Sequence, residues 1–192
     1  VSTPPLRLLK SYFIGQTPSS PKANGLPGLQ TPTPAPASLF MNSIIIFFAD
    51  YAIFLLFALL PVLWVQKKRE MVLHAVISAF IAWLIGKFLK DFFAVPRPYL
   101  VNGTNPLAGH FSGGSFPSNH TAAAFAVSVS IFLHKHKWGI PLIILSLIIG
   151  ISRILGGVHY PLDIIGGIII GTAVAWTAHR LHVHKLLDRL SL

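Results

Sequence analysis

The chain has 192 residues, 53% of them hydrophobic and only 10% charged, and 15 Lys and Arg against 5 Asp and Glu give a formal net charge of +10. An ordinary soluble domain carries about 25% charged residues, so this composition excludes such a domain and indicates a membrane protein. The lack of cysteine also excludes a disulfide framework and thiol chemistry.

The first 40 residues differ in composition from the rest of the chain. They hold eight of the 15 prolines, including the stretch TPTPAPA at 31–37. Such a segment can neither propagate a helix nor bury a core, and it lacks the pattern of a secretory signal peptide. We therefore predict a Pro-rich, disordered tail over 1–40 and a single membrane domain over 41–192.

Five apolar segments follow this tail. A helix of about 20 apolar residues crosses a bilayer. The segments are rich in Leu, Ile and Ala and do not show the alternation that is typical of strands in a membrane barrel. The sequence thus predicts an all-α, polytopic membrane helix bundle with about five transmembrane helices. The segments cover residues 44–65, 71–89, 120–133, 138–157 and 162–181.

Basic residues gather in the connections on one side of these segments. Three clusters lie there: residues 67–69, residues 134–137, and Arg180 with Lys185 and Arg189. Their shared side argues against nucleic acid as a partner, and the positive-inside rule makes that side cytoplasmic. The connections after the second and fourth segments then face outward, which predicts a multi-pass protein of the cell membrane.

Three cations nevertheless lie on the outward side, where positive charge is disfavoured: Lys90, Arg97 and Arg153. Guanidinium groups fit phosphate oxygens, and Lys90 adds a compact charge. The third apolar segment begins after Pro117 and Ser118, and a helix start offers unpaired backbone N–H groups to an anion. These features together predict a phosphate site.

Two histidines accompany the cations. His159 and Asp163 are spaced by one helical turn, so the carboxylate can accept a hydrogen bond from one ring nitrogen and leave the other as a nucleophile. His120 lies at the predicted helix start and can supply a proton to a leaving group. The pattern predicts one histidine that attacks and one that donates.

These residues occur in three stretches that resemble the signatures of the type 2 phosphatidic acid phosphatase (PAP2) superfamily, KxxxxxxRP, PSGH and SRxxxxxHxxxD. The matching positions are Lys90, Arg97 and Pro98; residues 117–120; and Ser152, Arg153, His159 and Asp163. Asn119 replaces the glycine of PSGH, and Asn tolerates unusual backbone angles. This residue, the FPSxHT context and residues 45–56 make the chain most similar to bacterial undecaprenyl-diphosphate phosphatases of the BcrC type.

The resemblance implies a role for each matching residue. Five would bind phosphate: Lys90, Arg97, Ser118, Asn119 and Arg153. His159 would become phosphorylated, Asp163 would orient it, and His120 would protonate the leaving group. Neither a metal ion nor a cofactor is implied.

The resemblance also implies the reaction, which is removal of the terminal phosphate of undecaprenyl diphosphate at the outer face of the membrane. Phosphatidate, phosphatidylglycerol phosphate and diacylglycerol diphosphate are alternative substrates. A transporter or lipid-binding protein without chemistry is a further alternative, against which the pair of His159 and Asp163 argues. The expected partners are the lipid substrate and membrane lipids, and the sequence specifies no oligomeric state.

Other polar residues receive simpler interpretations. Asp50 either pairs with a motif cation or lies at the interface, and we favour the interface. His110 belongs to the long outward loop. Six histidines on the cytoplasmic side are expected at the membrane interface: His74, His134, His136, His179, His182 and His184.

Overall fold

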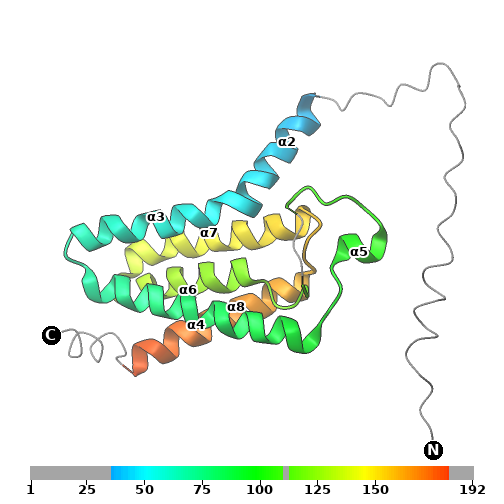
Figure 1. The fold of residues 1–192 in the computed structure, drawn as a ribbon. Coiled ribbons are helices and arrows are strands. Elements are labelled where there is room, and N and C mark those ends of the chain that lie inside the picture. The colour runs from blue at the N-terminus through cyan, green and yellow to red at the C-terminus, as the bar shows by residue number, and fades with distance from the viewer. Residues whose placement is uncertain (1–35, 110–112, 182–192) are drawn as a thin grey trace, which may run out of the picture. The chain divides into compact units, whose positions relative to one another are not determined.

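Helices form most of the chain in the computed structural model, which describes residues 36–109 and 113–181 (Figure 1). No strand occurs in these residues, so the all-α prediction is confirmed. The elements are α2 (Pro36–Ile46), the π-helical turn η1 (Phe47–Tyr51), α3 (Ala52–Val65), α4 (Arg69–Phe93), α5 (Pro98–Asn102), α6 (Asn119–His134), α7 (His136–Leu155) and α8 (Pro161–Arg180). The tail predicted for 1–40 lies outside the described residues up to residue 35 and stays a prediction there. For residues 36–40 the prediction is wrong, because they form the first turn of α2.

Four helical stretches in the described part of the chain are long and apolar enough to cross a membrane. They are Ala37–Val65, Arg69–Asn102, His136–Leu155 and Pro161–Arg180. The predicted third segment is the helix α6, which has 16 residues and is therefore only about 24 Å long. The five predicted segments are thus four long helices and one short one.

The short helix α6 lies at the centre and packs against α3, α4, α7 and α8 (Figure 1). Every residue from Thr121 to Ile131 on it is buried. Small side chains allow the close approach: a Cβ atom at Gly171 of α8 would lie 2.3 Å from the carbonyl oxygen of Ala122. Because α6 is covered by protein, its length need not match the bilayer.

Four helix ends meet at one end of the bundle, here called the motif end. They are the last turns of α4 and α7 and the first turns of α6 and α8 (Figure 1). Ser118 caps α6 by accepting a hydrogen bond from the backbone N–H of Thr121 at 3.4 Å. Pro161 opens α8 directly after its N-cap residue Tyr160. The turn chemistry of the sequence therefore places all three motifs at this end.

Candidate active site

The pair of His159 and Asp163 lies at the start of α8, as predicted. Nδ1 of His159 and Oδ2 of Asp163 are 3.1 Å apart, and both side chains are buried. The same Oδ2 accepts the backbone N–H of Tyr160 at 2.8 Å. When Nδ1–H donates to the carboxylate, Nε2 of His159 carries the lone pair. The arrangement can present a neutral, oriented imidazole to an electrophile.

Ser115 is a member of this group that the sequence did not reveal. Its hydroxyl donates a short hydrogen bond to Oδ2 of Asp163 and lies 3.4 Å from Nδ1 of His159. The residue is fully buried. In the sequence it lies in GGSFPS, where a serine beside glycines is typical of a loop, and it belongs to none of the three motifs. Asp163 is therefore held by donors from two segments of the chain.

The loop that carries Ser115 is fastened to the end of α4 by Lys90. Nζ of Lys90 donates to the carbonyl oxygens of Gly114 at 3.0 Å and Ser115 at 2.9 Å. The N–H of Ser115 donates to the carbonyl oxygen of Val95 at 2.7 Å. A Cβ atom at Gly114 would lie 2.7 Å from the carbonyl oxygen of Lys90, so the loop approaches α4 as closely as glycine allows.

Arg97 joins two loops of the motif end. Its Nε donates to the carbonyl oxygen of Gly113 and its Nη1 to that of Val158, each at 3.2 Å. The side chain is buried, and Val158 directly precedes His159. Arg97 therefore fixes the segment that enters α8 and places its charge near the pair of His159 and Asp163.

Arg153, at the end of α7, makes an ion pair with Asp50. Its Nη1 lies 2.6 Å from Oδ1 of Asp50 and donates to the carbonyl oxygen of Ala49 at 3.1 Å. Oδ2 of Asp50 accepts the N–H of Gly109 at 2.9 Å. The interface placement that we favoured for Asp50 is therefore wrong, because this carboxylate compensates a buried guanidinium. Asp50 lies in the π turn η1, a kind of turn that is frequent at functional sites.

The start of α6 supplies Ser118, Asn119 and His120. Ser118 Oγ accepts from the hydroxyl of Thr121 at 3.0 Å, and its backbone N–H donates to the carbonyl oxygen of Asp163, also at 3.0 Å. Asn119 is the first residue of α6 and has no special backbone angle, so the tolerance of Asn for unusual angles is not what allows it here. Its side chain instead lies against Gly86 of α4.

Gly86 makes the room for Asn119. A Cβ atom on Gly86 would lie 2.3 Å from Oδ1 of Asn119, which is too close for any larger residue without movement. The replacement of the signature glycine by Asn is thus matched by a glycine on the neighbouring helix. The sequence did not reveal this pairing, since 33 positions of chain separate the two residues.

Burial and charge hold the pKa of His159 well below its usual range. Burial is the largest cause, the charges of Arg153, Lys90 and Arg97 also lower the pKa, and the net value is about 4. The hydrogen bond to Asp163 raises the pKa, but it only partly offsets these effects. His159 is therefore neutral at physiological pH, the form in which an imidazole is nucleophilic.

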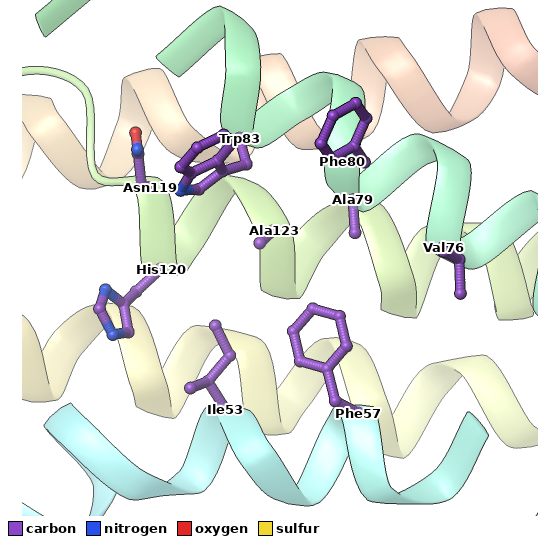
Figure 2. Close-up of a pocket in the computed structure, with 9 residues that line it drawn as sticks. All are labelled: Ile53, Phe57, Val76, Ala79, Phe80, Trp83, Asn119, His120 and Ala123. Carbon is purple, nitrogen blue, oxygen red and sulfur yellow. The ribbon is translucent and has the colours of Figure 1, made fainter. Parts of the chain in front are cut away.

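An apolar groove begins at His120 and Asn119 and runs along the bundle. Its volume is about 390 Å³. In Figure 2, Ile53 and Phe57 of α3 face Phe80 and Trp83 of α4, and Ala123 of α6 lies between them. The polar end of this groove is the active-site end of α6. An apolar chain attached to an anionic group can thus lie in the groove while its anionic end meets the histidines.

Comparison with known proteins agrees with this geometry. The model of the PAP2 superfamily matches residues 71–186. The bacitracin transport permease protein BcrC of Bacillus licheniformis is 36% identical over 77% of this chain and 77% of its own length. The undecaprenyl-diphosphatase BcrC of Bacillus subtilis is 32% identical, over 73% of this chain and 74% of its own.

A solved structure shares the fold. The crystal structure of Aquifex aeolicus LpxE is similar with a TM-score of 0.64 and 28% sequence identity, over 76% of this chain and 87% of that one.

Proposed function

Because the chain belongs to the PAP2 superfamily, we propose that this membrane hydrolase removes the terminal phosphate of undecaprenyl diphosphate. The observation that carries the proposal is the neutral imidazole of His159, held by Asp163 and Ser115 and placed among three cations. The undecaprenyl-diphosphatase name of the Bacillus subtilis relative supports the lipid.

In the first step, Nε2 of His159 attacks the terminal phosphorus. A P–N bond forms, the P–O bond to the bridging oxygen breaks, and His120, which the negative charge of the bound diphosphate keeps protonated, gives its proton to the leaving lipid monophosphate. In the second step, water attacks the phosphohistidine and His120 takes the proton back. Inorganic phosphate leaves, and His159 is restored as a neutral imidazole.

The phosphate oxygens are bound by Lys90, Arg97 and Arg153, and by the start of α6 at Ser118 and Asn119. Charge spreads over these oxygens in the transition state, where fixed cations and backbone N–H groups stabilise it most. Because Arg97 and Arg153 are buried and held by backbone carbonyl groups, little reorganisation is needed. No metal ion is required for this stabilisation.

The lipid chain lies in the groove between α3 and α4, with His120 at its polar end. This groove can hold the single chain of a prenyl lipid, whereas phosphatidate, phosphatidylglycerol phosphate and diacylglycerol diphosphate each carry two chains. The decisive experiment compares phosphate release from these four lipids by the purified protein, with chelator present. Equal turnover of all four lipids would contradict the preference for undecaprenyl diphosphate, and activity that depends on added metal would contradict the mechanism.

A non-catalytic transporter is the second candidate, and the transport permease name of the Bacillus licheniformis relative favours it. Binding alone does not require a buried carboxylate to orient an imidazole, whereas nucleophilic attack does. Rapid quenching with labelled lipid tests this point: an acid-labile phosphoprotein that disappears in His159→Ala supports the enzyme. Lipid binding without release of phosphate would establish the transporter.

The site faces the outside of the cytoplasmic membrane in this proposal. Basic residues at the opposite end of the bundle support the orientation through the positive-inside rule; they are Lys67, Lys68, Arg69, Lys135, Lys137 and Arg180. Because the chain has no cysteine, Asn102→Cys and Gln66→Cys can report the two sides separately. An impermeant maleimide applied to intact cells should label only the first, and labelling of only the second would reverse the orientation.

A further inference from the structure

Three histidines meet at the end of the bundle opposite the active site. His74 of α4, His134 of α6 and His179 of α8 each have a ring nitrogen within 4.8 Å of the others. Their ring centroids form a nearly equilateral triangle with sides of 5.1, 5.5 and 5.4 Å. His74 is 1% exposed, so its expected interface placement is wrong. Three separate helices thus bring imidazoles to one point.

Two of the rings are oriented by backbone carbonyl groups. Nε2 of His74 lies 2.9 Å from the carbonyl oxygen of Ala175, and Nδ1 of His134 lies 3.0 Å from that of Ser130. If these nitrogens carry the protons, the lone pair of His74 is on Nδ1, which lies 3.5 Å from Nδ1 of His134, and the His134 ring must turn to offer the lone pair of its Nε2 to the same point. Metal-binding histidines almost always donate their other N–H to such a partner, which fixes the ring and raises its basicity.

We propose that His74, His134 and His179 form a site for a divalent transition metal ion of the zinc class. Three neutral imidazoles suit zinc, copper or nickel, while calcium and magnesium require oxygen ligands. Tetrahedral coordination with Zn–N bonds of about 2.0–2.1 Å places ligand nitrogens about 3.3–3.4 Å apart. The nitrogens already lie within 4.8 Å, so small ring rotations close the site, and water supplies the fourth ligand.

A cavity of about 200 Å³ beside His134 gives access from the aqueous side. Its other lining residues are Lys67, Lys68, Arg69, Glu70, Met71 and Lys135. Four of these six residues are cationic. The same charges disfavour ions that depend on electrostatic attraction rather than on imidazole ligation.

The site is separate from the proposed chemistry and has a structural role. His120 and His134 are 14 residues apart on α6, which corresponds to about 21 Å along the helix. A bound ion would tie α4, α6 and α8 together, and these helices carry Lys90, His120 and Asp163 at their other ends. Metal binding therefore stabilises the bundle without touching substrate.

The experiment uses full-length protein, purified with a histidine-free affinity tag, stripped with chelator and titrated with Co²⁺ and Zn²⁺. We expect one equivalent bound per chain, visible absorption typical of tetrahedral Co²⁺, and a higher unfolding temperature that chelator reverses. His134→Gln and His179→Gln should abolish these signals. His136→Gln, at the same end and packed on Phe132, is the matched control and should keep them.

Several outcomes would overturn the site. Absence of stoichiometric binding by the wild-type protein is one, and unchanged binding in both glutamine variants is another. Loss of binding in His182→Ala/His184→Ala would assign the metal to the C-terminal segment instead. X-ray absorption of the wild-type complex counts imidazole ligands without any variant, so fewer than three would reject the site even if a variant fails to fold.

Discussion

Ser115→Ala tests the proposed mechanism most directly, because Ser115 acts on the nucleophile only through hydrogen bonds. Its hydroxyl donates to Asp163 and lies 3.4 Å from Nδ1 of His159. A hydrogen bond to a charged group contributes about 1.5–3 kcal/mol, and about 1.4 kcal/mol corresponds to a factor of ten in rate. Full loss of the contribution would lower kcat by about 10- to 150-fold.

The structure narrows this range. Asp163 keeps the N–H of Tyr160 at 2.8 Å and the ring of His159 at 3.1 Å, so the carboxylate remains partly oriented. We therefore expect a decrease in kcat toward the lower end, about 10- to 30-fold. KM should change little, because the hydroxyl of Ser115 contacts no residue that is proposed to bind phosphate, and the alanine keeps the backbone carbonyl that accepts from Lys90.

The assay is phosphate release from undecaprenyl diphosphate in detergent, with kcat and KM measured separately. Ser78→Ala is the matched control: Ser78 is also fully buried, and its hydroxyl has no hydrogen-bond partner within the described residues. Its activity should stay near that of the wild type. If Ser115→Ala keeps kcat within about twofold, or if both variants lose activity equally, the positioning role of Ser115 is refuted.

Three further predictions follow from the contacts around the site. Asp50→Ala leaves the buried guanidinium of Arg153 without its carboxylate. We therefore expect the free energy of unfolding in denaturant to fall by about 3 kcal/mol, and kcat/KM to fall at least tenfold. An unchanged free energy of unfolding and an unchanged kcat/KM would show that the ion pair contributes nothing. Gly86→Ala should displace Asn119 and lower activity, and Asn119→Gly in the same chain should restore it. If the effects of the two substitutions on activity simply add, the proposed pairing of Gly86 with Asn119 is contradicted. NMR titration of ¹⁵N-labelled histidine should find the pKa of His159 at about 4, so that its ring is neutral above that pH and gains a proton below it; a midpoint near 6.5 would contradict the proposed burial and charge effects.

The parts that were predicted from the sequence depend on local rules. Hydropathy locates the five helices because a membrane requires long apolar segments. Pro117 and Ser118 mark the start of α6, and His159 and Asp163 are close in sequence at the entry to α8, where Tyr160 is the N-cap residue and Asp163 lies in the first turn. For such residues, the local pattern and the tertiary position agree.

The parts that were missed depend on contacts between distant segments. Ser115 meets His159 across 44 residues, and Asp50 meets Arg153 across 103. His74 and His134 are 60 residues apart and meet because the start of α4 and the end of α6 lie at the same end of the bundle. No local periodicity encodes such encounters, since they depend on how the helices are rotated and shifted against one another.

The short central helix has a consequence for where in the bilayer the reaction takes place. With 16 residues, α6 falls about 6 Å short of the roughly 30 Å hydrocarbon layer that the outer helices span. The first residues of α6 lie inward of the last turn of α4 (Figure 1), so in the proposed mechanism a lipid can deliver its headgroup sideways without rising out of the leaflet. The depth of that recess follows the thickness of the host membrane, so turnover in vesicles is tied to the acyl-chain length of the surrounding lipid.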